Sequence, residues 1–270
     1  MAHSSISVDA RPGLRDLTAC EGVCAADHAQ MTTAKLHTTF LSACIALTAL
    51  LSSQREALAQ TKDDGALWLQ SINQGKFGEK DSPLAKWRWW LEAQGRWRDN
   101  GETFDTGIFR PGIGYAITDR VIAHVGYAFI DNEPENRPVV HENRIWQQLT
   151  WNVPVEGFTL QSRTRLEERF IVDESDEGWR LRQFFKATVP VVEDKTTFVS
   201  AWEEMFWDLD DTDWGQRTGF RQNRAFLGLG QFFDEKKSIS IEVGYLNQWI
   251  DRPGEDRLNH VLLVCMFMTF

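Results

Sequence analysis

Charged residues that could bind ions recur at every second position of several apolar segments. In the segment 158–169, for example, Arg163, Arg165 and Glu167 fall on alternate positions. A period of two places such residues on one face of a β-strand. Surplus guanidinium groups bind carboxylate or phosphate, so the chemistry indicated is anion recognition. Reading every segment in this way gives a charged set in which ten Arg outnumber three Glu: Arg88, Glu92, Arg96, Arg110, Arg144, Arg163, Arg165, Glu167, Arg169, Arg180, Arg182, Arg224 and Glu242.

The segments that hold these charges have an apolar opposite face. In 87–98, Trp87, Leu91 and Trp97 share that face, so it begins and ends in Trp. A soluble β-sandwich also alternates, but its polar face contacts bulk water. An apolar face bounded by aromatic residues is typical of a transmembrane barrel, in which the charged face lines the lumen. The sequence therefore predicts an all-β fold, a transmembrane antiparallel up-and-down β-barrel.

The number of strands follows from the same alternation. Ten strands are predicted from Leu84 onward, and Leu67–Phe77 is a candidate eleventh at the periplasmic edge or in the lumen. Bacterial barrels normally have an even number of strands, so ten spanning strands are expected, with twelve as the alternative. The segment 196–208 is ambiguous because aromatic residues occur on both of its faces. Periplasmic turns are short and extracellular loops longer. This rule predicts short connections near 118, 155, 193 and 235, and longer loops at Asp131–Glu142, Asp173–Gly178, Leu209–Gly219 and Asp251–Arg257.

The segment 259–270 has an apolar face that ends on the last residue. It resembles the final strand of bacterial outer-membrane barrels, which the barrel-assembly machinery reads. The alternative is a buried last strand of a soluble β-domain. The residues of this membrane-insertion face are Leu262, Val264, Met266, Met268 and Phe270.

The beginning of the chain has the composition of an export signal. A basic region at Lys35 and His37 precedes the apolar run Phe40–Leu51, and Ala57-Leu58-Ala59 follows as a small-x-small site. This pattern predicts a signal peptide cleaved after Ala59. The run is shorter than the roughly 20 residues that a membrane-spanning helix needs. The predicted organisation is a non-native or mis-assigned extension (1–30), a signal peptide (31–59), an N-terminal segment with one candidate strand (60–83) and an outer-membrane barrel (84–270).

The composition of the chain limits the kinds of molecule that it is expected to bind. The formal net charge of −10 argues against nucleic acid. Cys265 is the one cysteine after the signal, so neither an intramolecular disulfide nor a paired-cysteine metal site is expected. No metal and no cofactor are predicted. We expect a monomer in the outer membrane of a Gram-negative cell, in contact with lipid and lipopolysaccharide. A small anionic solute is the expected ligand.

Several short pieces of the chain resemble the DUF2490 family, bacterial proteins of uncharacterised function that are expected to be outer-membrane barrels. The resemblance covers about residues 65 to 270 and implies a fold and a location, but no activity. This chain departs from the family pattern by an acidic run before Asp213, where a small polar residue is usual. The pieces are Asn143–Gln148, Arg163–Glu167, Trp179–Gln183, Asp213–Gly215, Gln222–Arg224, Gly244–Gln248 and Asn259–His260.

Three functions remain open for such a barrel. The lumen charges either pair fully and plug it, or leave a narrow anion-preferring, porin-like path or ligand site. The alternative is a hydrolase acting on lipid or peptide at the extracellular rim, with His141, Asp213 and His260 as candidates. No Ser-His-acid set or familiar catalytic motif is recognised, so no catalytic residue is assigned. A soluble lipocalin-type barrel is a further alternative, which the many Trp residues at strand ends disfavour.

Overall fold

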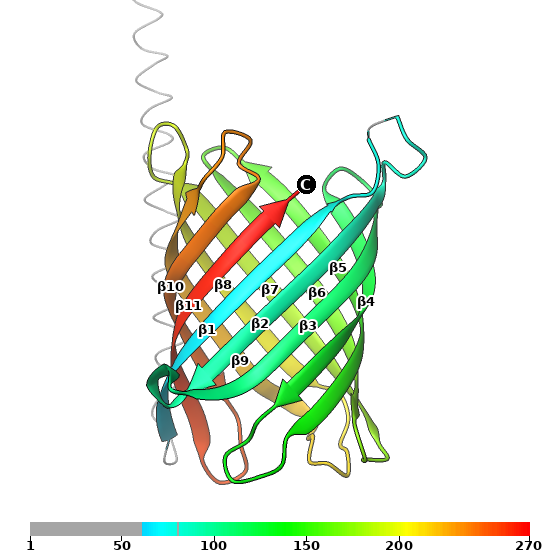
Figure 1. Ribbon diagram of the computed structural model, residues 1–270, viewed down its shortest axis with the longest axis vertical. Helices are drawn as coiled ribbons and strands as arrows, with labels where there is room; N and C mark the ends of the chain where they lie inside the picture. The colour runs from blue at the N-terminus through cyan, green and yellow to red at the C-terminus, as the bar shows by residue number, and fades with distance from the viewer. Residues whose placement is uncertain (1–60, 80) are drawn as a thin grey trace, which may run out of the picture. The chain divides into compact units, whose positions relative to one another are not determined.

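A computed structural model describes residues 61–79 and 81–270, and in this part of the chain eleven strands form one closed barrel (Figure 1). The predicted extension and signal peptide lie outside the described residues. A short 3-10 turn, η2 (Asp99–Gly101), connects the second and third strands. The strands are β1 (Thr61–Lys76), β2 (Trp87–Arg98), β3 (Thr103–Ala116), β4 (Val121–Asn132), β5 (Val140–Val155), β6 (Phe158–Ile171), β7 (Glu177–Pro190), β8 (Thr197–Asp208), β9 (Gly219–Phe232), β10 (Ile239–Ile250) and β11 (Asp256–Thr269).

Consecutive strands pair antiparallel from β1 to β11, and a parallel pair closes the ring between β1 and β11. In that pair Leu67 lies opposite Leu262 and Leu69 opposite Val264. The prediction of an all-β up-and-down barrel is confirmed, and β2 to β11 are the ten strands expected from Leu84 onward. The candidate Leu67–Phe77 strand is β1, a full member of the wall. Eleven replaces ten or twelve because an even number is required only when every pair is antiparallel.

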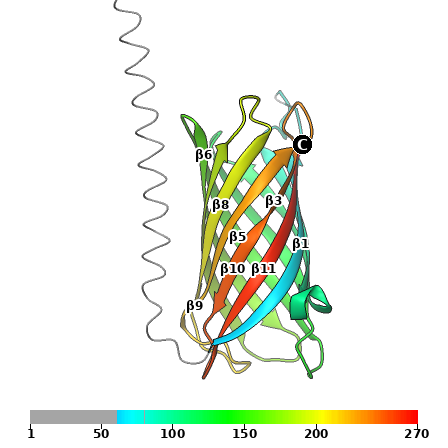
Figure 2. The same cartoon turned by 90° about the vertical axis from the view of Figure 1, so that its left-hand side faces the viewer.

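The two ends of the barrel differ in which chain ends they hold. β1 and β11 start at the same end, which we call the N-terminal rim, and both finish at the opposite end, the C-terminal rim (Figures 1 and 2). The connections predicted near 118, 155, 193 and 235 all lie at the C-terminal rim. No helix in the described residues is long and apolar enough to cross a membrane.

The predicted alternation of short and long connections holds only in part. The connections 191–196 and 233–238 at the C-terminal rim are longer than 172–176 and 251–255 at the other rim. The reason is that the backbone ladder continues into residues that the sequence assigned to loops. Glu177 and Asp256 begin strands, and β5 starts at Val140, before the predicted loop has ended.

The outward face of the barrel is apolar. Its side chains include exposed aliphatic and aromatic residues on nearly every strand, and Leu227 and Leu229 are 61% and 60% exposed. This distribution is the reverse of that in a soluble barrel, whose apolar side chains fill the interior. Other exposed members are Phe109, Ile113, Val125, Phe129, Leu149, Trp151, Phe185, Val243, Tyr245 and Leu262.

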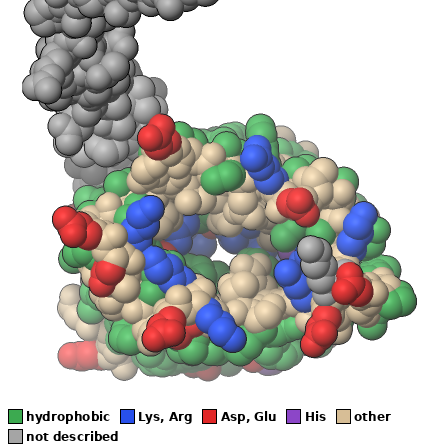
Figure 3. Space-filling model, turned by 90° about the horizontal axis from the view of Figure 1, so that it is seen from above, with side chains coloured by type: hydrophobic (Ala, Val, Ile, Leu, Met, Phe, Trp, Pro, Cys, Tyr) green, Lys and Arg blue, Asp and Glu red, His purple; other side chains and the backbone are tan. Residues whose placement is uncertain are grey.

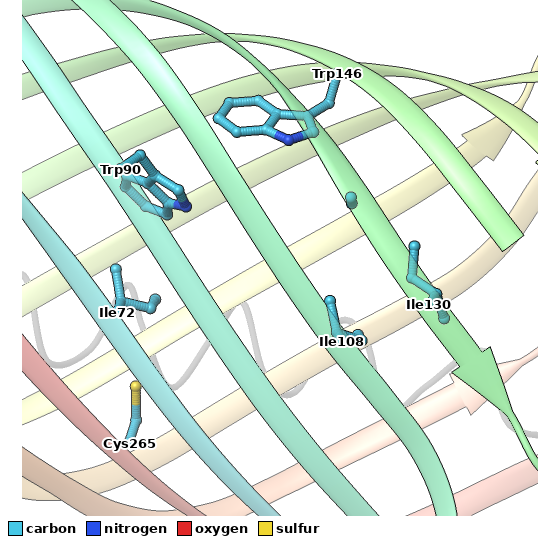
Figure 4. Packing of buried hydrophobic residues seen from close by; sticks show 7 residues of the cluster. Ile72, Trp90, Ile108, Ile130, Trp146 and Cys265 are labelled. Carbon is cyan, nitrogen blue, oxygen red and sulfur yellow. The ribbon is translucent and has the colours of Figure 1, made fainter.

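Part of the lumen wall is nevertheless apolar. A cluster on β1 to β5 and β11 contains Trp90 and Trp146 with their rings 6.5 Å apart at 65° (Figure 4). Trp146 Nε1 donates to the Tyr127 carbonyl at 3.0 Å, so its buried donor is satisfied. Gly112 and Gly126 leave room for that ring, because a Cβ at either position would collide with it. The remaining members of the cluster are Ile72, Ile108, Ala128, Ile130 and Cys265.

The burial of its side chains shows which face of β8, the strand with aromatic residues on both faces, points into the lumen. Glu204 and Phe206 are buried in the lumen, and Trp202 lines it, whereas Met205 and Trp207 take the other face. A register shift opposite β9 falls between Phe206 and Trp207. Aromatic residues therefore occur on both faces because this strand contributes them to the lumen as well as to the outer surface.

Candidate functional site

The structure places the thirteen predicted lumen charges on inward-facing strand positions. Arg165 and Glu167 are almost fully buried, with 1% and 0% of their surface exposed. Arg88 and Arg96 line a cavity that opens at the C-terminal rim. Alternation along each strand accounts for this arrangement, since every second side chain of a closed barrel must point inward.

Carboxylates in the half of the lumen next to the N-terminal rim each bind more than one Arg. Glu142 accepts from Arg144 at 2.7 Å and from Arg169 at 2.6 Å. Glu167 binds Arg144 at 3.0 Å and Arg182 at 2.6 Å. These bonds run between β5, β6 and β7, so they tie neighbouring strands together through their side chains.

Two further carboxylates continue the network toward the C-terminal rim. Glu92 binds Arg110 at 2.6 Å and also accepts from the amide of Gln70. Glu204 binds Arg163 and Arg182, each at 2.8 Å. Removing one member of such a buried pair leaves an uncompensated charge, which costs about 3–5 kcal/mol.

Four members of the lumen were not in the predicted set. Glu142 was assigned to a loop, and Glu204 and Asp208 lie on the ambiguous strand. Asp208 accepts from Arg180 at 2.6 Å. Lys186, which follows the alternation of its strand, binds Glu242 at 2.5 Å. Lys186 shares a strand face with Arg180 and Arg182, and this periodicity could have identified it as a lumen residue.

The basic surplus persists after these residues are included. Glu204, for example, is shared by three guanidinium groups, because Arg224 Nη1 lies 3.7 Å from its second oxygen. Arg96 forms no ion pair with a carboxylate in the described residues, and donates instead to Gln94 Oε1 at 3.1 and 2.6 Å. The lumen therefore retains positive charge although the whole chain is acidic.

Aromatic rings hold several of these guanidinium groups in place. The centre of the Trp68 ring lies 3.9 Å from the Arg96 guanidinium and 4.9 Å from that of Arg224. Arg224 also lies 4.7 Å from the Phe206 ring, which contacts Arg182 at 4.7 Å. Stacking fixes the plane of a guanidinium while leaving its N–H edge available to an anion.

A cavity of about 600 Å³ extends from the C-terminal rim to this charged layer. Figure 3 looks into that end and shows an opening at the centre of the barrel with Lys and Arg side chains around it. The mouth is lined by Gln74, Asn152, Thr159 and Thr188, and Arg96, Arg163 and Arg224 line the cavity from strands on different sides.

The N-terminal rim is narrowed by the connection 209–218. Gln216 from this loop is 4% exposed and accepts from Arg169 Nη1 at 2.8 Å. Its amide also donates to Asp210 Oδ1 at 2.5 Å. A second cavity of about 280 Å³ lies here, lined by Arg180, Trp214 and their neighbours.

The candidates for rim catalysis bind different partners. His141 contacts Asp131 at 2.6 Å, His260 contacts the Tyr245 hydroxyl at 2.6 Å, and Asp213 accepts from the Ser175 hydroxyl at 2.7 Å. The geometry therefore gives no nucleophile–base–acid arrangement for these three residues.

The acidic loop has structural partners of its own. Asp211 accepts from the Thr218 backbone N–H at 2.6 Å, and that bond holds the pKa of the Asp211 carboxyl below its ordinary value. Asp210 accepts from the Trp179 backbone N–H at 2.8 Å. No group of three or more His, Cys, Asp or Glu within 61–79 and 81–270 could hold a metal ion.

Comparison with known proteins identifies relatives without a known activity. An uncharacterised protein of Methylorubrum extorquens is 32% identical over 238 residues, which cover 87% of this chain and 99% of the relative. Residues 65–259 match the family described as "Protein of unknown function (DUF2490)". This chain therefore belongs to the DUF2490 family.

Proposed function

We propose that this protein spans the bacterial outer membrane and that its lumen admits small anions through a narrow, anion-preferring path. The observation that carries the proposal is the cavity of about 600 Å³ with surplus Arg at its inner end. An aqueous cavity lined by one sign of charge raises the local concentration of ions of the opposite sign.

The apolar outward face supports the membrane location. Exposed side chains such as Phe129, Trp151 and Leu227 form a surface that is costly in water but favourable against lipid. Closure of the ring leaves no unpaired edge among the described strands, which favours a monomer. The signal peptide expected at 31–59 would deliver the chain for export.

The lumen charges support anion preference over complete pairing. In a plug, each guanidinium would have its own carboxylate, yet Glu204 serves three and Arg96 has Gln94 instead. The opening in Figure 3 is consistent with a path between these side chains. Fixed cationic groups of this kind select anions over cations in pores.

Conductance in a planar bilayer tests the proposal directly. The purified barrel, shown to be folded by a heat-modifiable gel shift, is expected to give steady currents whose reversal potential under a salt gradient indicates anion selectivity. The Arg96→Gln variant should reduce that selectivity, whereas Arg120→Gln, in an exposed turn, should not. A folded barrel without conductance would establish the plugged alternative, and cation selectivity would refute the charge assignment.

The contacts of Phe270, at the end of the last strand, are compatible with the proposed assembly by the outer-membrane machinery. The Phe270 backbone N–H donates to the Gln74 carbonyl at 2.9 Å, its carbonyl accepts from Lys76 N at 3.1 Å, and its ring stacks on Trp89 at 5.8 Å. We expect deletion of Phe270 to lower the amount of barrel in outer-membrane fractions, with Phe270→Tyr as the control. Equal amounts of wild type and deletion variant would contradict this role.

A further inference from the structure

We propose that the inner end of the large cavity is a binding site for a small carboxylate with a planar, apolar body, such as an aromatic acid. The inference rests on the proposed function, because a ligand must reach the cavity from the C-terminal rim. It goes further by assigning a ligand class to particular residues.

The anion-binding part is formed by Arg96, Arg163 and Arg224. All three line the cavity. Arg163 and Arg224 share Glu204, which also binds Arg182, and Arg96 has no carboxylate partner in the described residues. A second carboxylate placed there would relieve the repulsion among these cations. Guanidinium edges bind carboxylates in bidentate geometry, which favours a carboxylate over a spherical anion.

The acidic side chains on the same walls do not oppose such a ligand. Glu92 is bonded to Arg110 at 2.6 Å, and Glu242 to Lys186 at 2.5 Å and to the Ser200 hydroxyl at 3.0 Å. Their negative charge is therefore compensated within the wall. At the inner end, by contrast, Arg96 has no carboxylate partner in the described residues, and Arg163 and Arg224 share one.

The planar part is formed by aromatic side chains beside these cations. Trp68, Phe184 and Trp202 line the cavity, with 5.4 Å between the rings of Phe184 and Trp202. Arg163 lies over the Phe184 ring at 4.4 Å. A flat ring can stack on aromatic residues while its carboxylate reaches the adjacent guanidinium, whereas a bulky aliphatic body cannot.

Unpartnered polar atoms give a separate indication of a ligand. Arg163 Nε, Trp90 Nε1 and His124 Nδ1 are buried without a hydrogen-bond partner, and all three residues line the cavity. Trp90 and His124 are 7% and 6% exposed. Buried polar groups without partners are rare in folded proteins, so an acceptor inside the cavity is expected. A volume of about 600 Å³ suits a small molecule.

Isothermal titration calorimetry on the full folded barrel in detergent tests the assignment. Benzoate is the probe, with acetate and inorganic phosphate as anions without a ring and benzyl alcohol and benzylamine as rings without the anion. Benzoate is expected to bind at least about tenfold more tightly than any of them, a factor equivalent to one charge-assisted hydrogen bond. Cyclohexanecarboxylate, which keeps the charge but not the planarity, should fall in between.

Variants locate the site. Arg163→Gln should weaken benzoate binding by about tenfold or more, and Trp202→Leu should remove the preference for benzoate over cyclohexanecarboxylate. Arg120→Gln is the matched control on the exposed turn. The comparison of ligands on the wild-type barrel remains decisive if a variant does not fold.

The outcomes separate this inference from the proposed function. Equal affinity for benzoate, acetate and phosphate, together with anion-selective conductance, would overturn the planar site while leaving the path intact. Absence of binding by every anion, together with no conductance, would overturn both. Tighter binding of benzylamine than of benzoate would also refute the inference.

Discussion

Glu204 determines how the charges at the inner end of the cavity are balanced. It is 3% exposed and lies within 4 Å of guanidinium groups from three strands. A carboxylate shared in this way holds β6, β7 and β9 to β8 through side chains as well as through the backbone. The same sharing leaves the cations only partly neutralised, which is what the proposed anion site requires.

Replacement of Glu204 by Gln is expected to destabilise the barrel by about 3–5 kcal/mol, because three buried cations lose their common partner. The measurement is the temperature of the heat-modifiable gel shift, or the urea concentration at half unfolding. Glu203→Gln is the matched control, since the adjacent side chain lies on the outward face and bonds only Asn223 of β9 in the described residues. Equal stability of Glu204→Gln and wild type would show that the network does not stabilise the fold.

At the scale of elements, β1 and β11 decide the architecture. Their parallel pairing runs through fourteen residue pairs from Thr61 opposite Asp256 to Gln74 opposite Thr269. In a parallel pair, moving two residues toward the C-terminus on one strand moves the opposite position two residues toward the C-terminus on the other. In an antiparallel pair the opposite position moves toward the N-terminus. Two matched cysteine pairs can therefore distinguish parallel from antiparallel pairing of β1 and β11.

Cysteine pairs at Leu67 with Leu262, and at Leu69 with Val264, are each expected to form a disulfide in a chain whose native cysteines are replaced by Ala. Both pairs are directly opposite in the ladder. Neighbouring strands lie about 4.8 Å apart, a separation that a disulfide spans. The readout is a shift in gel mobility that reductant reverses. The mismatched pair Leu67 with Val264 should cross-link poorly, and cross-linking of only one matched pair would contradict the parallel register.

The connection 209–218 is the element that limits access from the N-terminal rim. Gln216→Ala removes the bonds to Arg169 and Asp210 and should let the loop leave the lumen, so conductance should rise without loss of folded barrel. Val172→Ala, in the neighbouring connection 172–176, is the control. Unchanged conductance in Gln216→Ala would mean that the constriction lies in the mid-lumen network instead.

Local periodicity predicted the strands and the inward set, because side-chain direction depends only on position along one strand. It did not predict which charges meet, since Arg163 and Glu204 are 41 residues apart and belong to strands that the sequence does not order in space. Glu142 was missed because the ladder continues into a segment with the composition of a loop. The odd strand number was missed because parallel pairing between the two ends of a chain has no local pattern.

At the scale of the whole molecule, an odd strand number places the start of β1 and the end of β11 at opposite rims (Figure 1). If the C-terminal rim faces the periplasm, as the proposed membrane location and assembly imply, Thr61 would lie at the cell surface. An even-stranded barrel places both ends on the same side.

An epitope inserted between Gln60 and Thr61 is therefore expected to be labelled by antibody on intact cells. An epitope between Glu156 and Gly157, in the turn at the C-terminal rim, should be labelled only after the outer membrane is permeabilised. Western blotting of outer-membrane fractions controls for assembly of both variants. Protection of both epitopes in intact cells would contradict the odd strand number, and labelling of only the 156–157 epitope would contradict the assumed orientation.

The parallel closure also has a consequence for folding kinetics. Ten of the eleven strand pairs join neighbours in sequence, whereas Asp64 and Arg257, which bond at 2.7 Å across the closure, are 193 residues apart. Contacts of such high contact order form late, because the entropy of closing a long loop must be paid first. β1, the first of the described strands, can therefore complete its pairing only after β11, the last strand, is present. Until β11 pairs, both sheet edges remain unpaired and open to aggregation. If the protein is exported as proposed, chains truncated before Asp256 should be degraded by periplasmic proteases faster than the full chain.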